Sequence, residues 1–265
     1  MEPVIKLAID EHIATLTLNR PQSLNSLNAA MASTLRPYCQ QLSDDTQVRC
    51  VIIQGEGGHF MAGGDIGYFA QSLQLAEEER YQQVSGIIAI VHEAITAIRG
   101  MPKPVIASVS GAVAGFGISL MAACDMAIAA ENSRFASAYC QLGVSPDGGN
   151  TYFLPRSIGE KRSKFLTFLG DPLDAHTALN MGLINQVVSV EELPHATLKL
   201  AKRLCQAPAK AVANAKQLLN TSLNHTLEQQ LQAEQAGFAG CTLTADFAEG
   251  VRAFLQKRPP RFGSS

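Results

Sequence analysis

The chain has 265 residues, of which 46% are hydrophobic and 17% are charged, with a net charge of −2. The apolar content suffices for a buried core and excludes an intrinsically disordered chain, and the length allows one large domain with a small appendage. The near-neutral charge offers no general basic surface, so nucleic-acid binding is not expected.

The six cysteines stand singly, with no Cys-x-x-Cys pair, and the six histidines show no metal-ligand spacing. Scattered thiols are typical of a reducing compartment rather than of a disulfide framework or a zinc site. The first residues also lack the basic start and apolar run of a signal peptide. We therefore expect a soluble, cytoplasmic protein without a metal site.

The chain opens with alternating side chains over residues 4–9 and 13–18, which predict a β-hairpin with its turn at Asp10-Glu11. A helix is expected from about residue 26 or 28 to residue 42. Pro37 lies inside it and predicts a kink or an earlier end.

Short apolar runs at residues 50–54, 105–109 and 126–129 predict buried strands, and apolar residues at helical spacing over 76–98 predict a helix. Alternating strands and helices favour parallel βαβ units with right-handed crossovers. After about residue 190 the strand signals stop. Three helical stretches follow, at residues 191–206, 210–224 and 227–239.

Residues 104–124 contain no charge and are long enough to span a bilayer of about 30 Å. However, the run opens with Pro104, is broken by glycines, and is followed at once by Asp125. This pattern favours a buried strand, a glycine loop and a buried helix over a membrane span.

Two glycine-containing loops follow buried strands, at residues 59–66 and 110–119. Glycine lets backbone N–H groups approach a ligand, and two such groups can bind one oxygen as an oxyanion hole. The alternative is that each loop is an ordinary strand-to-helix turn. Neither loop has the spacing of a dinucleotide-binding or phosphate-binding loop, so nucleotide chemistry is not expected.

Short motifs occur in a fixed order along nearly the whole chain: Asn19-Arg20-Pro21, Leu24-Asn25, Ala62-Gly-Gly-Asp65, Lys103-Pro-Val-Ile-Ala, Gly111 to Gly117, Cys124-Asp125, Phe135 through Pro146-Asp-Gly-Gly, Ala178 to Gly182-Leu-Ile-Asn-Gln-Val-Val, and Phe254-Leu-Gln-Lys-Arg-Pro. Together they resemble the crotonase (enoyl-CoA hydratase/isomerase) superfamily. The resemblance implies an α/β fold, with a crotonase-like ββα spiral core over residues 1–200 and a C-terminal helical trimerisation region over 201–265. It also implies an acyl-CoA substrate of the kind found in fatty acid metabolism, a homotrimer or dimer of trimers, and no cofactor besides the coenzyme A of the substrate.

The resemblance also implies roles for single residues. The N–H groups of Gly64 and Phe116 would form the oxyanion hole for the thioester carbonyl. Substrate or coenzyme A contacts would come from Leu24, Asn25, Ala62, Gly63, Asp65, Ile66, Gly115, Tyr139, Phe254 and Lys257. Within this set, Asp65 is expected to act as a backbone or helix-capping partner rather than a base. Phe254 and Lys257 resemble positions that touch the coenzyme A of a neighbouring subunit, although Lys257 is otherwise an ordinary surface lysine.

The hydratases that the chain resembles use two glutamates, and Ser119 and Tyr139 stand at those positions here. Neither is an adequate base near pH 7, because an unperturbed tyrosine ionises near pH 10 and serine far higher. The sequence therefore predicts that this chain is not an ordinary enoyl-CoA hydratase.

A carboxylate remains nearby at Asp147, where isomerases that resemble this chain carry a catalytic aspartate. A single carboxylate suffices to move a double bond from 3-enoyl-CoA to 2-enoyl-CoA. From the residues alone, Pro-Asp-Gly is equally a turn signal. The position of Asp147 among the motifs of the resembled family favours a catalytic role and predicts an enoyl-CoA isomerase.

Other functions stay open for this chain. The chain could process aryl-CoA compounds, as a ring-derived enoyl-CoA isomerase or as a hydrolytic dehalogenase. The dehalogenase that the chain resembles uses a histidine near the position of His92, but it also uses a tryptophan, and this chain has none. A structural role for His92 in its helix is the alternative. The loss of both glutamates also fits a weakly catalytic subunit that binds coenzyme A.

Overall fold

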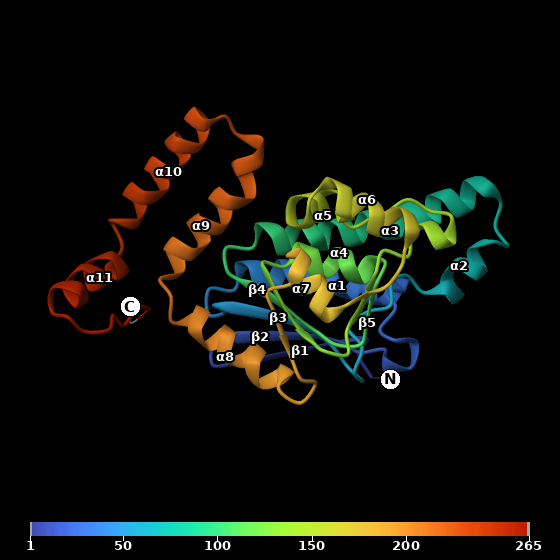
Figure 1. Cartoon of the computed structure of the whole chain (residues 1–265), viewed down its shortest axis with the longest axis horizontal. Coiled ribbons are helices and arrows are strands. Elements are labelled where there is room, and N and C mark those ends of the chain that lie inside the picture. The colour runs from blue at the N-terminus through green and yellow to red at the C-terminus, as the bar shows by residue number, and fades with distance from the viewer. Residues whose placement is uncertain (1, 264–265) are drawn as a thin grey trace.

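In the computed structural model, which describes residues 2–263, a six-stranded sheet forms the centre of the body (Figure 1). Its order is β1 (Ile5–Asp10), β2 (Ile13–Leu18), β3 (Cys50–Gly55), β4 (Val105–Val109), β6 (Met126–Ala130) and β9 (Gln186–Val188). The predicted hairpin is confirmed: β1 and β2 are antiparallel, with Ile5 opposite Leu18. The other neighbours pair in parallel, as the alternation of strands and helices predicted.

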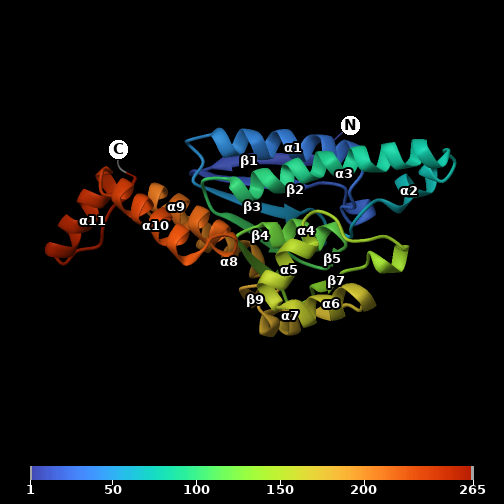
Figure 2. The same ribbon diagram turned by 90° about the horizontal axis from the view of Figure 1, so that it is seen from above.

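Helices cover both faces of this sheet. On one face, α1 (Ala29–Asp44) and α3 (Glu77–Gly100) lie side by side, with the buried α4 (Phe116–Ala123) next to them (Figures 1 and 2). On the other face lies α8 (Leu193–Cys205) (Figure 1). Side chains on β3 alternate between these layers: Ile52 packs in the cluster with α8, and Ile53 packs in the main core.

A second, three-stranded sheet consists of β5 (Ala112–Ala114), β7 (Arg134–Ala136) and β8 (Leu173–Asp174). The sequence analysis predicted none of these strands, because two or three residues carry too little periodicity to detect. Met61 forms a parallel bridge to Val113 of β5. This bridge places the first glycine loop beside the second.

Short helices complete the body: α2 (Ile66–Ser72), α5 (Asn150–Ile158), α6 (Glu160–Leu169) and α7 (Ala175–Met181). The helix predicted to begin near residue 28 is confirmed. Asn28 caps α1 by accepting from the N–H of Met31, and α1 continues past Pro37 to Asp44. In the uncharged residues 104–124, the predicted strand and helix are β4 and α4, and the predicted glycine loop between them also contains the short strand β5. Within residues 2–263, no helix combines the length and the apolar character needed to cross a membrane.

The last helices, α9 (Ala209–Thr221), α10 (Leu227–Cys241) and α11 (Ala245–Leu255), extend away from the body (Figures 1 and 2). We call residues 209–255 the C-terminal arm. The predicted helices at 210–224 and 227–239 correspond to α9 and α10, whereas α11 was not predicted. Lys216 of α9 connects the arm to the body through an ion pair with Asp125, with 2.7 Å between Nζ and Oδ2.

Candidate active site

A cavity of about 270 Å³ lies between the two glycine loops, α3 and the segment that ends at Asp147. Eight of the residues singled out from the sequence line it: Ala62, Gly63, Gly64, Ile66, Gly115, Phe116, Tyr139 and Asp147. These residues come from segments far apart in the chain. The fold therefore brings both glycine loops and the one predicted catalytic carboxylate to a single cavity.

Glycine is required where the two loops meet. Gly63 has a φ of +93°, which side-chain-bearing residues rarely adopt, and a Cβ there would lie 3.2 Å from the carbonyl oxygen of Ala114. Gly115 also has a positive φ, and its Cβ would lie 3.4 Å from the Cα of Gly63. The backbones of the two loops are thus in close contact beside the cavity.

Two backbone N–H groups at this contact are available to a ligand. Among the hydrogen bonds within residues 2–263, none uses the N–H of Gly64 or that of Phe116. Their neighbours are engaged: the N–H of Asp65 donates to Leu27 O at 2.9 Å, and that of Gly115 donates to Ala136 O at 3.0 Å. Since Gly64 and Phe116 line the same cavity, they are suited to bind one oxyanion.

Asp147 is held in a network of hydroxyl groups. The Tyr139 hydroxyl donates to Asp147 Oδ1 at 2.6 Å and lies 2.8 Å from Ser119 Oγ. Ser119, which is fully buried, also lies within 2.9 Å of the Asp147 carbonyl oxygen, to which it can donate. The two residues at the positions of the hydratase glutamates therefore orient Asp147.

Burial raises the pKa of the Asp147 carboxyl above its ordinary value, while the hydrogen bond from Tyr139 opposes part of this rise. Burial also raises the pKa of Tyr139, whose side chain therefore stays protonated and continues to donate. A carboxyl group with a raised pKa beside a cavity is suited to accept and return a proton near neutral pH.

Other residues from the sequence analysis lie outside the cavity. Asn25 is buried, and its side-chain amide donates to the carbonyl oxygens of Glu56 and His59, so it joins two loops. Leu24 is exposed, and its carbonyl oxygen accepts from the N–H of Ala62. Both residues therefore stabilise the first glycine loop without lining the cavity.

Asp65 caps α2, as expected for a capping residue. Its Oδ1 accepts from the N–H groups of Gly67 and Tyr68, and its Oδ2 lies 2.7 Å from the Arg20 guanidinium. Phe254 is 85% exposed at the end of α11, on the far side of the molecule from α2 (Figure 1). Lys257, with a φ of +53°, lies two residues beyond the end of α11.

The apolar wall of the cavity comes mainly from α3, α2 and the segment before Asp147. The side chains of this wall are Tyr68, Phe69, Val84, Ile87, Ile88, Val91, Leu142 and Val144. The i, i+3, i+4, i+7 spacing on α3 was visible in the sequence. It indicated a buried face but not which residues face a cavity.

His92 lies on α3, in the helix where the sequence analysis placed it. Its side chain is exposed, and its Nε2 lies 3.1 Å from the N–H of Gly148, from which it accepts. No sequence signal pointed to this contact, since the two residues lie 56 positions apart.

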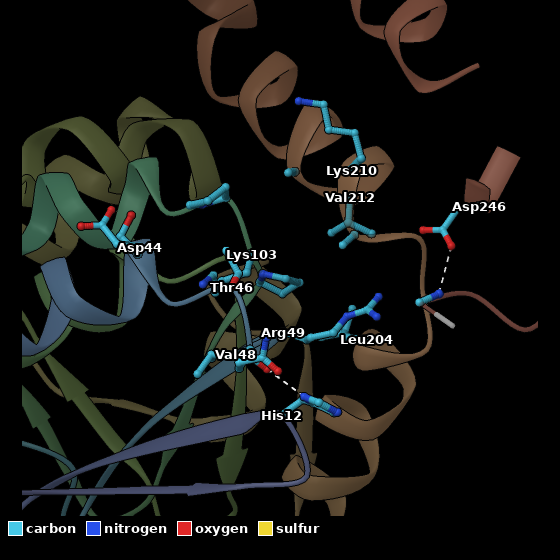
Figure 3. A pocket seen from close by; sticks show the side chains of 17 residues that line it. His12, Asp44, Thr46, Val48, Arg49, Lys103, Leu204, Lys210, Val212 and Asp246 are labelled. Atoms are coloured by element: carbon cyan, nitrogen blue, oxygen red, sulfur yellow. Dashed lines mark hydrogen bonds between the residues drawn. The ribbon is translucent and has the colours of Figure 1, made fainter. Parts of the chain in front are cut away.

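A larger cavity of about 520 Å³ lies where the C-terminal arm joins the body (Figure 3). Three of the charged residues that line it are engaged in contacts within the fold. Lys103 donates to the carbonyl oxygens of Leu42 and Asp45, and Arg49 donates to that of Ala207. Asp246 accepts from the N–H of Gly263 (Figure 3). The smaller cavity, with its carboxyl and free N–H groups, is therefore the candidate active site.

The chain is similar to known proteins along nearly its whole length. Residues 8–265 match the profile of a family described as enoyl-CoA hydratase/isomerase. The chain is 35% identical to 1,2-epoxyphenylacetyl-CoA isomerase of Escherichia coli, with 96% of each chain covered, and 34% identical to crotonyl-CoA hydratase of Syntrophomonas wolfei, with 97% of each covered. The crystal structure of an enoyl-CoA hydratase from Polaromonas sp. JS666 superimposes with a TM-score of 0.91 at 34% identity, covering 97% of this chain and 99% of that one.

Proposed function

Because the chain belongs to the enoyl-CoA hydratase/isomerase family, we propose that it moves the double bond of a 3-enoyl-CoA to give 2-enoyl-CoA, with Asp147 carrying the proton. The observation that carries this proposal is the position of Asp147. Its partly buried carboxyl lines the same cavity as the unused N–H groups of Gly64 and Phe116. The crotonase fold and the family's use of acyl-CoA substrates agree with it.

In this reaction the thioester carbonyl oxygen accepts from the N–H groups of Gly64 and Phe116. Asp147 takes a proton from C2, the two N–H groups stabilise the dienolate, and Asp147 returns the proton to C4. An oxyanion-hole donor contributes about 3–4 kcal/mol in well-studied cases. Since one carboxyl performs both proton transfers, the reaction needs no second acid and no cofactor besides the coenzyme A of the substrate.

Hydration is less well supported because it needs a water molecule to be held and activated. Tyr139 and Ser119 stand where the resemblance places the two hydratase glutamates, and the raised pKa of Tyr139 makes it still weaker as a base. Both hydroxyl groups are engaged with Asp147 and with each other. These hydroxyl groups hold Asp147 in place instead of activating a water molecule.

A ring-derived acyl group is the second candidate substrate. The relative from Escherichia coli is named for an isomerisation of 1,2-epoxyphenylacetyl-CoA, and Tyr68 and Phe69 line the cavity together with the aromatic residues Phe116 and Tyr139. An aromatic or ring-opened acyl group would use the same oxyanion hole and the same carboxyl.

We further propose that the C-terminal arm forms a homotrimer, or a dimer of trimers. The arm carries many exposed large apolar side chains, such as Leu223, Leu227, Phe238, Leu243 and Leu255. A surface of this kind is typical of a subunit contact. In such an assembly Phe254 and Lys257 would contact the coenzyme A of a neighbouring subunit, since they lie far from the cavity of their own chain.

Replacing Asp147 with asparagine tests the proposed reaction. We expect Asp147→Asn to lower the turnover of a 3-enoyl-CoA by about 10²–10⁴-fold, because the amide cannot take up the proton, while the KM stays nearly unchanged. The measurement is a spectrophotometric assay of the 3-enoyl-CoA, with crotonyl-CoA assayed in parallel for hydration.

The matched control is Asp174→Asn, which makes the same chemical change at an aspartate that caps α7 outside the cavity. It should leave the turnover unchanged. Efficient hydration of crotonyl-CoA, or isomerisation that survives in Asp147→Asn, would contradict the proposal. Absence of activity on both substrates would favour an aryl-CoA substrate or a subunit that only binds coenzyme A.

A further inference from the structure

The peptide group between Asp147 and Gly148 is held from both sides. Its carbonyl oxygen lies 2.9 Å from Ser119 Oγ, and its N–H donates to His92 Nε2 at 3.1 Å. Ser119 belongs to α4 and His92 to α3. Two helices of the body thus contact the one peptide that follows the proposed catalytic residue.

Gly148 makes this support necessary. It has a φ of +60°, and a Cβ on it would lie 2.7 Å from the Phe116 ring and 2.9 Å from Ser119 Cβ. Only glycine fits there. Glycine also allows the adjoining peptide to rotate more freely than other residues do, so the peptide needs outside contacts to keep its orientation.

We propose that His92 is a positioning residue, which holds the Asp147–Gly148 peptide so that the Asp147 carboxyl stays aimed at the cavity. This inference rests on the proposed function of Asp147. His92 is not among the residues that line the cavity, and it acts through the backbone of Gly148.

The hydrogen bond defines the state of the His92 ring. An Nε2 atom that accepts cannot carry a proton, so the ring is neutral and its hydrogen is on Nδ1. Protonation of the ring would remove the acceptor.

The charges around His92 leave Asp147 as its main ionic neighbour. The loop brings Asp147, while α4 carries no ionisable side chain. On α1, Arg36 pairs with Glu93, the residue next to His92, at 3.3 Å. The neighbouring positive and negative charges on α1 and α3 therefore compensate each other.

Two substitutions at His92 test the proposal. His92→Gln places an oxygen acceptor the same number of bonds from Cα as Nε2, whereas His92→Leu has no acceptor. We expect kcat with a 3-enoyl-CoA to fall roughly tenfold in His92→Leu with little change in KM, and to stay within about threefold of the parent in His92→Gln.

Rescue by the conservative variant is a readout that a merely structural role would not give, because glutamine keeps an acceptor atom where leucine has none. An unchanged kcat in His92→Leu, or an equal loss of kcat in His92→Gln, would overturn the role of His92.

A nuclear magnetic resonance measurement separates this inference from the proposed function. In protein labelled with ¹⁵N-histidine, the signal missing from His92→Gln should report an unprotonated Nε2 and a protonated Nδ1 at neutral pH. If Asp147→Asn kept full activity, the proposed function of Asp147 would be refuted. The protonation of the two ring nitrogens would still show whether His92 accepts the hydrogen bond from Gly148. A protonated Nε2 would refute the contact itself.

Discussion

At the scale of single residues, Tyr139 controls the chemistry of Asp147. Its hydroxyl donates to Asp147 Oδ1, and this bond opposes the rise in the pKa of Asp147 that burial causes. A tyrosine that only filled space would have no such effect. Tyr139 is thus a hydrogen-bond donor that keeps the proposed base ionised.

We expect Tyr139→Phe to move the acidic limb of the pH profile to higher pH. Loss of the hydroxyl removes a contact that lowers the pKa of Asp147, so the pKa rises further and the base form appears only at higher pH. At neutral pH, kcat/KM should fall roughly tenfold, since a hydrogen bond to a charged group is worth about 1.5–3 kcal/mol. The measurement is kcat/KM for a 3-enoyl-CoA as a function of pH.

Tyr152→Phe is the matched control, because Tyr152 lies on α5 and does not line the cavity. Its profile should coincide with that of the parent. A limb that stays in place or moves to lower pH in Tyr139→Phe would show that the phenol does not stabilise the carboxylate.

At the scale of elements, the first glycine loop depends on the cap of α2. Asp65 directly follows Gly64, whose N–H is a proposed oxyanion donor. It accepts from two N–H groups of α2 and pairs with Arg20. Burial alone would raise the pKa of Asp65, but the hydrogen bond and charge of Arg20 and the N–H groups of Tyr68 and Gly67 lower it below its ordinary value. This stabilisation is therefore present above the ordinary range of aspartate and is lost only as the pH falls through the lowered pKa.

We expect Asp65→Ala to weaken α2 by about 1–2 kcal/mol, the range found for removal of an N-cap. Asp65→Ser should lose less, because serine also caps helices well. Hydrogen exchange at the N–H groups of Gly67 and Tyr68 measures the effect directly. Asp174→Ala, which removes the cap of α7, should leave α2 unaffected. Equal exchange in the parent and in Asp65→Ala would rule out the cap as a support of this loop.

At the scale of the whole molecule, the C-terminal arm joins the body through few contacts. Lys216 donates to the carbonyl oxygens of Ile98 and Lys103 as well as to Asp125, and Asn220 donates to that of Arg99. Beyond α9 the arm exposes apolar side chains to solvent. A second copy of the chain is the occupant proposed for this surface.

We expect Phe238→Asp to dissociate the proposed trimer. Phe238 lies on α10 and is 74% exposed in the single chain, so its replacement should not disturb the body. A charge buried in a subunit contact is strongly unfavourable. Sedimentation velocity should show smaller species, with an unchanged circular dichroism spectrum. Leu198→Asp, a matched change at an exposed residue of α8, should keep the parent's assembly. A monomeric parent would contradict the proposed assembly.

The sequence by itself determined the elements whose signal is local. The buried strands at 50–54 and 105–109 appeared as apolar runs, and helices α9 and α10 of the arm appeared through their spacing, because a strand or helix of sufficient length carries its own periodicity. Motif resemblance indicated the family, and with it Gly64, Phe116 and Asp147 as site residues. The spiral arrangement came from that resemblance, since periodicity does not specify the order of strands.

Only the tertiary structure decided how these residues meet. The close contact of Gly63 with Gly115, the hydroxyl network of Ser119, Tyr139 and Asp147, and the bond from Gly148 to His92 join segments between 8 and 56 residues apart. Such contacts depend on packing of the sheet and helices around them, and no local pattern encodes them. For the same reason Asn25, a buried link between two loops, could not be told in advance from a residue that touches the ligand.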